Sequence, residues 1–242
     1  MGSYLNPGNK GFQESLNSKI YVDKTGLIEK TNAALNTRQK FMCVSRPRRF
    51  GKSMAADMLA AYYARGEDSA ELFESLKISK AESYEKHRNQ YDVIKVNMQE
   101  FLSMTHSMDE MLVMLQKYLI FDLMDHFETV RFRDEHNLIQ VMKDIYSKTN
   151  HSFIILIDEW DCLFREYKQD KEAQKEYLDF LRAWLKDKDY VALAYMTGIL
   201  PIKKYGSHSA LNMFTEYSMT DPGDLAKYFG FTEKEVFGLC EK

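Results

Sequence analysis

Three short apolar runs constrain the fold of this 242-residue chain more than any other feature. They cover residues 41–45, 153–157 and 190–196, and each run is followed by a turn or by polar residues. A strand with one solvent-exposed face alternates apolar and polar residues, whereas a strand that is buried on both faces is apolar throughout. The runs therefore predict strands of a mostly parallel sheet that is covered by helices on both sides.

Helical patterns and weaker strand patterns fill the stretches between these runs. Apolar spacing and strong helix formers predict helices at 53–64, 107–129, 134–149 and 169–186, and shorter patterns predict strands at 91–97 and 214–219. Strands and helices thus alternate, which predicts an α/β fold with a mostly parallel central sheet. In such sheets ligands bind beyond the carboxyl ends of the strands, so the residues that follow each apolar run are candidates for a site.

Composition and charge exclude several classes of protein. Hydrophobic residues make up 45% of the chain, enough for a large core, which excludes a disordered or collagen-like chain. The net charge of -3 provides no overall basic field for coating nucleic acid, although local basic patches stay open. The three cysteines fit neither a zinc ribbon nor a disulfide framework, and no apolar run approaches the roughly 20 residues of a membrane helix. We expect a cytoplasmic protein that does not enter a membrane.

The segment after the first apolar run has the pattern of a phosphate-binding loop. Residues 45–53 read Ser-Arg-Pro-Arg-Arg-Phe-Gly-Lys-Ser, and Gly51-Lys52-Ser53 match the second half of G-x-x-x-x-G-K-[ST]. A glycine lets main-chain N–H groups approach a phosphate, the lysine reaches the β- and γ-phosphates, and the serine hydroxyl ligates Mg²⁺. Arg46 stands where the pattern has its first glycine. The tripeptide alone is equally compatible with a helix start that binds no ligand.

The second apolar run ends in Asp158-Glu159, which is the pattern of a Walker B strand. Asp158 is expected to hold Mg²⁺ through a water molecule, and Glu159 is expected to polarise the attacking water as general base. The alternative is an acidic strand end that only faces solvent. Asp161 either joins this acidic cluster or caps the next helix. The two motifs support each other, because their order and their secondary structure agree with one nucleotide site.

Weaker candidates surround these motifs. Thr197 ends the third run and is a candidate sensor of the γ-phosphate, although a threonine that caps the following turn fits equally well. Lys203 and Lys204 follow closely, and a solvated basic pair is favoured over a phosphate contact. The basic run Arg46–Arg49 either clamps phosphates, shapes the loop or touches nucleic acid. Its position directly before Gly51 and Lys52 favours a contact with the nucleotide or a structural role in shaping the loop.

Five motifs together resemble the bacterial AAA-ATPase-like domain family over about residues 4–242. They are Tyr-Val-Asp-Lys-Thr at 21–25, the basic loop at 45–53, Leu-Ile-Asp-Glu-Trp-Asp at 156–161, Thr-Gly-Ile at 197–199 and Tyr-Phe-Gly-Phe-Thr at 228–232. The loop Arg-Pro-Arg-Arg-Phe-Gly-Lys-Ser is typical of the family, so Arg46 fits this resemblance. Trp160 stands where the family commonly has tyrosine.

The resemblance implies a P-loop NTPase of the additional-strand Glu class, with one strand inserted between the phosphate-loop strand and the Walker B strand. It places Asp23 and Lys24 near the nucleotide. Longer relatives often carry a C-terminal nuclease-like domain of the PD-(D/E)xK type, and no such carboxylate–lysine constellation is found in this chain. A fused or associated nuclease-like domain and nucleic acid are therefore open as partners, as is the oligomeric state.

These observations predict a module that binds ATP and, with Mg²⁺, hydrolyses it. Glu159 and Thr197 are the expected catalytic residues, and Ser53 and Asp158 the expected Mg²⁺ ligands. The expected nucleotide-binding residues are Arg46, Pro47, Arg48, Arg49, Phe50, Gly51, Lys52 and Ser53. The alternatives are a nucleotide-gated interaction module with little turnover and an ATP-dependent component of nucleic-acid processing or defence. Glu159 argues against the first, because a switch needs no base.

The chain is expected to divide into a P-loop domain at 1–220, with an N-terminal segment at 1–40, and a second region at 221–242. Thr232 and Glu235 have the spacing of a capping box, which predicts a helix start close to the last residue. We expect this second region to be the truncated start of a helical part.

Overall fold

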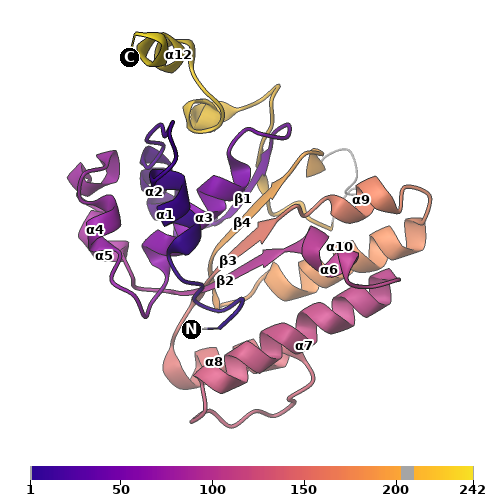
Figure 1. Cartoon of the computed structure of the whole chain (residues 1–242). Coiled ribbons are helices and arrows are strands. Elements are labelled where there is room, and N and C mark those ends of the chain that lie inside the picture. Colours follow the sequence, from indigo (N-terminus) through magenta and orange to yellow (C-terminus); the bar gives the residue numbers. More distant parts are fainter. Residues whose placement is uncertain (1, 203–209, 242) are drawn as a thin grey trace.

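A single sheet of five parallel strands forms the centre of the computed structural model, which describes residues 2–202 and 210–241 (Figure 1). The strands are β1 (Phe41–Ser45), β2 (Asp92–Asn97), β3 (Phe153–Asp158), β4 (Val191–Gly198) and β5 (Thr215–Tyr217). Their order in the sheet is β2-β3-β4-β1-β5. β4 therefore lies between β1, which precedes the glycine loop, and β3, which ends at Asp158, and this order confirms the inserted strand that the resemblance implies and the α/β fold that the sequence predicts.

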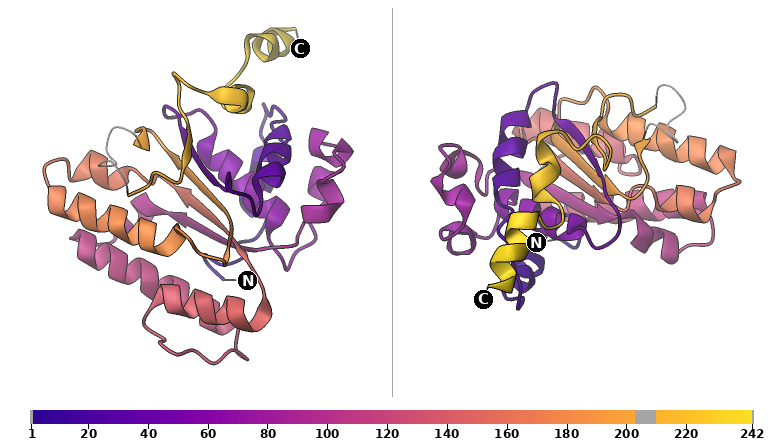
Figure 2. Two further views of the ribbon diagram at one scale, coloured as in Figure 1. Left: turned by 180° about the vertical axis from the view of Figure 1, so that it is seen from behind. Right: turned by 90° about the horizontal axis from the view of Figure 1, so that it is seen from above.

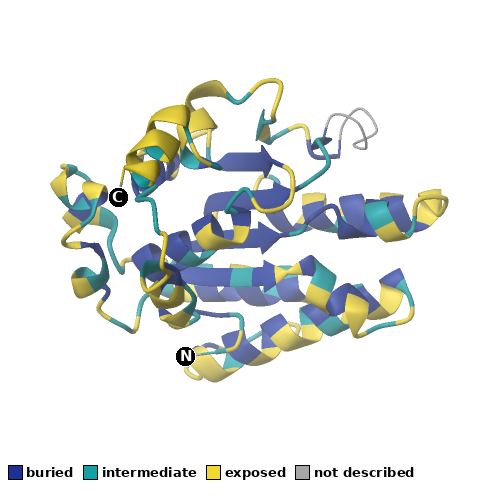
Figure 3. Ribbon diagram, turned by 45° about the horizontal axis from the view of Figure 1, so that its top comes forward, coloured by how far each residue is buried: buried dark blue, intermediate teal, exposed yellow. Residues whose placement is uncertain are grey.

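The central strands are buried on both faces, as their continuous apolar sequences predict (Figure 3). Every residue of β1, β3 and β4 is buried, and so are most residues of β2. The side chains that point to the two sides of the sheet form two separate hydrophobic cores. This burial fixes the register of the parallel strands, because a shift by one residue would exchange the two sets of side chains.

Helices cover both faces of the sheet (Figures 1 and 2). The first face is covered mainly by the N-terminal part of the chain, in the order α1 (Lys10–Leu16), α2 (Gly26–Ala34), α3 (Lys52–Tyr63), α4 (Ala70–Phe73), the 3₁₀ helix η1 (Lys77–Lys80) and α5 (Tyr84–His87). The second face is covered by α6 (Met98–Ser103), α7 (Met108–His126), α8 (Leu138–Thr149), α9 (Cys162–Glu166) and α10 (Lys171–Leu185). None of the described helices is both long enough and apolar enough to cross a membrane.

Most predicted helices and strands form. Their first and last residues are determined by side-chain caps and by strand pairing. Helix α8 begins at Leu138 rather than near 134, because the side chain of Asn137 accepts a hydrogen bond from the N–H of Gln140. Strand β4 continues through Thr197 to Gly198, because β1 pairs with it up to Ser45. The expected sensor residue thus lies in the strand itself and not after it.

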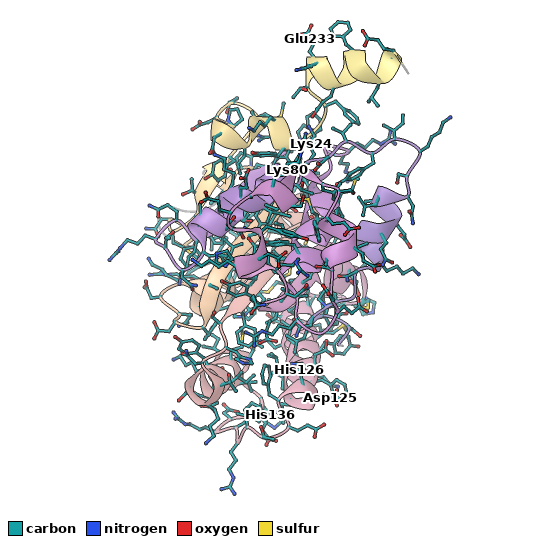
Figure 4. The ribbon with its side chains drawn as sticks, turned by 90° about the vertical axis from the view of Figure 1, so that its left-hand side faces the viewer. Lys24, Lys80, Asp125, His126, His136 and Glu233 are labelled. Atoms are coloured by element: carbon teal, nitrogen blue, oxygen red, sulfur yellow. The ribbon has the colours of Figure 1, made fainter. Side chains whose placement is uncertain are left out.

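The C-terminal segment lies at one end of the molecule and contacts the N-terminal segment. It contains the 3₁₀ helix η2 (Gly223–Tyr228) and α12 (Glu233–Cys240), and the predicted capping box of Thr232 and Glu235 is present. Lys24 donates hydrogen bonds of 2.7 Å to the carbonyl of Lys227 and to the carboxylate of Glu235. Figure 4 shows Lys24 beneath α12, whose Glu233 is labelled, at the end of the molecule opposite His126 and His136.

Candidate functional site

The three predicted motifs meet at the carboxyl edge of the sheet. Ser45, the last residue of β1, pairs with Gly198 of β4, and Ile157 of β3 pairs with Met196 of β4. Asp158 is the last residue of β3, so its side chain lies next to Thr197. The parallel topology thus brings residues together that are far apart in the sequence, at the edge where such sheets bind ligands.

The loop after β1 turns directly into α3 at Gly51. This glycine has φ 78° and ψ 18° and stands at the N-cap of α3, and among the described residues no atom beyond its chain neighbours and its own helix lies within 4 Å of where a Cβ would be. The left-handed conformation suits glycine, and the open side leaves room at the positive end of the helix. An anion can therefore approach the first main-chain N–H groups of α3.

Lys52 is a buried cation at the start of α3. Its Nζ donates hydrogen bonds of 2.9 Å to the carbonyl oxygens of Arg46 and Pro47, and its third N–H has no acceptor among the described residues. Burial lowers the pKa of Lys52, and the negative charges of Glu159 and Asp158 oppose this effect. The loop therefore holds the ammonium group in place through its own carbonyl oxygens.

Asp158 is the centre of a hydrogen-bond cluster. Its Oδ2 accepts a 2.5 Å hydrogen bond from Oγ of Ser53, and its Oδ1 accepts from the hydroxyl of Thr197 and from the N–H of Glu159. The aspartate is 4% exposed. A buried carboxylate needs such donors, and the hydroxyl and carboxylate oxygens of Ser53 and Asp158 are of the kind that Mg²⁺ prefers. The predicted Mg²⁺ ligands and the predicted sensor residue are therefore in direct contact.

Backbone strain marks the same two motifs. Seven described non-glycine residues have positive φ, and five of them are Asn or Asp, which adopt this conformation with little strain. The other two are Arg49, with φ 70°, in the phosphate loop and Glu159, with φ 53°, directly after β3. Strained backbone of this kind is concentrated at functional sites. The strain at these two positions therefore supports a shared site.

The side chain of Arg46 is buried and connects the start of the loop to the sheet. Its guanidinium is buried, donates hydrogen bonds to the carbonyls of Ser45 and Tyr217, and lies over the ring of Phe229. Burial lowers the pKa of Arg46. Of the two interpretations that its position favoured, the geometry fits the structural one, because the side chain joins β1 to β5.

The rest of the basic loop lies on the surface. Pro47, Arg48 and Arg49 are exposed, and Phe50 is half-buried. The carbonyl of Phe50 accepts a 3.1 Å hydrogen bond from the N–H of Gly230. The C-terminal segment is therefore attached directly to the phosphate loop.

Asp161 has a role that differs from both expectations. It is fully buried, and its Oδ2 accepts hydrogen bonds from the N–H groups of Ile199 at 3.0 Å and Leu200 at 2.8 Å. It stands at the N-cap of α9 without a side-chain cap there. The side chain thus ties the turn after β3 to the chain that leaves β4.

Arg165 is a residue of this site that sequence reasoning missed. It pairs with Glu159 and lies 3.5 Å from Asp161. The available signal was the spacing of four residues between Asp161 and Arg165, which places an acid and a base on the same side of a helix.

A mostly apolar pocket of about 160 Å³ opens beside the phosphate loop. It lies between the N-terminal segment, the first turns of α3 and the C-terminal segment. Its lining residues are Phe12, Ser15, Ile20, Tyr21, Val22, Lys24, Arg49, Phe50, Gly51, Met54, Ala55, Met58, Tyr228, Gly230 and Phe231. Lys24 thus lies near the loop as the resemblance implies, whereas the carboxylate of Asp23 accepts hydrogen bonds from the N–H groups of Thr25 and Lys77.

The described residues contain no cluster of three or more His, Cys, Asp or Glu side chains that could hold a metal ion by itself. Mg²⁺ commonly takes only one or two protein ligands and completes its shell with phosphate oxygens and water, so the pair Ser53 and Asp158 still fits this ion. Lys203 and Lys204 lie outside the described residues.

The strand order, the loop after β1 and the acidic end of β3 define a P-loop NTPase-like protein. The chain belongs to the AAA-ATPase-like family, described as predicted AAA-ATPases, which matches residues 9–207. It is also 24% identical over 225 residues to an uncharacterised protein from the vnfD 5′ region of Azotobacter chroococcum mcd 1. This match covers 89% of the present chain and 40% of the relative. The family supports nucleotide binding at a coarse level.

Proposed function

We propose that this chain is an ATP-binding module that hydrolyses ATP with the help of Mg²⁺. The observation that carries the proposal is the hydrogen bond between Ser53 and Asp158, beside the buried Lys52 at the start of α3. A hydroxyl, a carboxylate and an ammonium group in this arrangement suit a metal–phosphate ligand. Family membership supports the same conclusion.

Each residue of the cluster has a place in this proposal. Lys52 and the main-chain N–H groups at the start of α3 bind the phosphates. Ser53 and, through water, Asp158 hold Mg²⁺, which when bound would neutralise phosphate charge. Thr197 keeps Asp158 oriented through the hydrogen bond to Oδ1.

Glu159 is the proposed general base. Water attacks the γ-phosphorus, one O–H bond of the water breaks, and the proton passes to the Glu159 carboxylate. The new P–O bond forms as the bond to the leaving ADP oxygen breaks, and that oxygen keeps the electron pair. The carboxylate is partly exposed, with 22% of the side chain accessible, so water can reach it.

The apolar pocket is the proposed adenine site. It adjoins Gly51 of the loop and offers aromatic and aliphatic side chains for a planar base, among them Tyr21, Met54 and Phe231. The described lining is mostly apolar and aromatic, which suits a planar base. Adenine is the proposed base because the family is described as predicted ATPases.

Two substitutions test this proposal. Lys52→Ala should abolish binding of a fluorescent ATP analogue, because the phosphates lose their buried cation. Glu159→Gln should retain binding and lose phosphate release, since the amide cannot take up the proton. Lys40→Ala is the matched control: Lys40 also donates to main-chain carbonyls, but from the amino end of β1.

Unchanged ATP affinity in folded Lys52→Ala would contradict the assignment of the loop. Tight ATP binding without phosphate release above background in the unmodified chain would instead support a nucleotide-gated interaction module. A gel shift of DNA that weakens with added salt would support the nucleic-acid alternative.

A further inference from the structure

Arg165 lies in α9 and pairs with Glu159, the proposed base, and only 16% of its side chain is exposed. Its Nη2 donates a hydrogen bond to Oε2 of Glu159 and lies 3.5 Å from Oε1 of Gln99. Its Nε lies 3.5 Å from Oδ2 of Asp161. The guanidinium thus contacts three side chains that come from the ends of β2 and β3.

The position of Arg165 is fixed by a buried anchor. Asp161 is fully buried, and its Oδ2 already accepts the N–H groups of Ile199 and Leu200. The carboxylate therefore cannot rotate without leaving two main-chain donors unpaired, which is costly in a protein interior. Arg165 is four residues beyond Asp161, the N-cap of α9, and its Nε forms a 3.5 Å ion pair, without a hydrogen bond, with this fixed carboxylate.

This anchor restricts Glu159 to one arrangement. Its backbone has φ 53°, and its Oε2 is occupied by Arg165, whereas Oε1 has no hydrogen-bond partner among the described residues. Glu159 directly follows Asp158, whose Oδ2 accepts a hydrogen bond from Ser53 at the start of α3, so this residue lies at the edge of the sheet where the loop is. Arg165 thus binds one carboxylate oxygen, and the other has no partner among the described residues and can accept a hydrogen bond from water.

We propose that Arg165 is a positioning residue for Glu159. It binds Oε2 so that Oε1 is directed at the water that attacks ATP. This inference rests on the proposed function, in which Glu159 is the general base. A partly exposed glutamate would otherwise sample several side-chain conformations, of which few direct an oxygen at that water.

The experiment compares turnover and binding in Arg165→Ala and Arg165→Lys. Arg165→Ala should lower kcat by about ten- to a hundredfold, as expected when a catalytic group is misplaced. The Kd for a fluorescent ATP analogue should change much less than kcat, because Lys52 and the main-chain N–H groups at the start of α3, and not Arg165, are the proposed phosphate ligands. Arg165→Lys keeps the charge and should recover part of kcat. Arg165→Gln keeps most of the side-chain length and replaces the alanine variant if that variant does not fold.

A double-mutant cycle separates positioning from a general structural role. In the Glu159→Gln background, Arg165→Ala should cause no further loss of the residual turnover, because the base is already absent. Arg88→Ala is the matched control: Arg88 is equally buried, at 16% exposure, and pairs with two carboxylates far from the loop. It should leave kcat unchanged.

Three results would overturn the inference. The first is unchanged or increased turnover in Arg165→Ala, the latter showing that the ion pair restrains Glu159 instead. The second is an equal fractional loss in both backgrounds, and the third is a loss of ATP affinity that accounts for the whole effect. Failure of the proposed function itself is visible separately, because the unmodified chain would then not bind or hydrolyse ATP.

Discussion

Oγ of Ser53 lies 2.5 Å from Oδ2 of Asp158, although 105 residues separate the two in the chain. The first stands at the start of α3 and the second at the end of β3, so the contact joins the two sequence motifs in space. The other oxygen of Asp158 is bound by Thr197 and by the N–H of Glu159. The buried carboxylate is therefore held in one orientation, with Oδ2 beside the hydroxyl that the phosphate loop supplies.

Asp158→Asn should remove the effect of Mg²⁺ on ATP affinity. The amide preserves the shape of the side chain but carries no charge for the cation, and loss of such a metal-supporting group costs at least about tenfold in affinity. Titration of a fluorescent ATP analogue with Mg²⁺ and with EDTA measures the effect. Asp144→Asn is the control. Asp144 is a buried residue of α8 whose carboxylate accepts hydrogen bonds from the N–H of Arg133 and from the side chain of Gln140. An equal Mg²⁺ response in both variants would contradict the assignment.

Thr197→Val should lower both stability and turnover. The change keeps the volume and removes one of the two donors to Oδ1 of Asp158, which keeps the N–H of Glu159; a hydrogen bond to a charged group contributes about 1.5–3 kcal/mol. We expect kcat to fall more than KM rises, because Asp158 loses its orientation. Thr31→Val removes a buried hydroxyl that bonds to Tyr63 and Ile28, away from the loop. If the two variants lose stability alike and both keep full turnover, Thr197 has only a structural role.

Phe231→Ala should weaken ATP binding without weakening binding of inorganic tripolyphosphate. Phe231 lines the apolar pocket, and removal of an aromatic contact to a base costs about 1–3 kcal/mol. Tripolyphosphate has no base, so it reports on the loop alone. Phe237→Ala in α12 is the control, because Phe237 is equally exposed, at 62% against 60%, and does not line the pocket. A parallel loss for both ligands would argue against a base site here.

Gly198→Ala should destabilise the fold by about 1–3 kcal/mol, the usual cost of overpacking. An added Cβ would lie 2.6 Å from Nε1 of Trp160 and 2.8 Å from Oδ1 of Asp161, and both side chains are fully buried. Urea unfolding measures the loss. Gly238→Ala, in α12, where no described atom outside the helix backbone lies within 4 Å of the new Cβ, should instead be neutral or stabilise the helix by about 0.5–1 kcal/mol. Equal stability of the two variants would contradict this packing argument.

Alkaline pH should destabilise the folded chain through Cys162. Burial raises the pKa of its thiol to about 12, whereas in the unfolded chain the thiol ionises near pH 8.5. The stabilising effect is complete below about pH 8.5 and is lost as the pH rises towards 12, because only the unfolded chain releases the proton. Between pH 8 and 10 the free energy of unfolding should fall by about 1–2 kcal/mol less in Cys162→Ala than in the unmodified chain. Identical falls would show that Cys162 does not contribute.

Several parts of this protein follow from local sequence. The apolar runs at 41–45, 153–157 and 190–196 predict strands that are buried on both faces, and the structure confirms them. The capping box of Thr232 and Glu235 also forms as predicted. These features depend on residues that are close in the chain, so periodicity and capping patterns are enough to find them.

The sequence also identified Gly51-Lys52-Ser53 and Asp158-Glu159 as candidates, while the role of Arg46 stayed open. Its side chain enters the interior because Tyr217 of β5 supplies a carbonyl contact and Phe229 supplies a ring contact there. No spacing rule places residues 217 and 229 beside residue 46, so this burial could not be predicted. The same holds for Arg165, whose contact with Glu159 depends on the direction in which α9 leaves the sheet.

By itself, the sequence determined the strands, the helix after the phosphate loop and the chemical types of the candidate site, since hydrophobic periodicity and motif spacing are properties of neighbouring residues. The place of β4 between β1 and β3 was implied by the family resemblance and not by the residue pattern. Only the tertiary structure decided the contacts from Asp161 through Arg165 to Glu159 and the pocket between the N- and C-terminal segments. Lys24 and Glu235, which are 211 residues apart, pair beside that pocket. The physical reason is that such contacts depend on how whole elements pack, and packing is a property of the complete core.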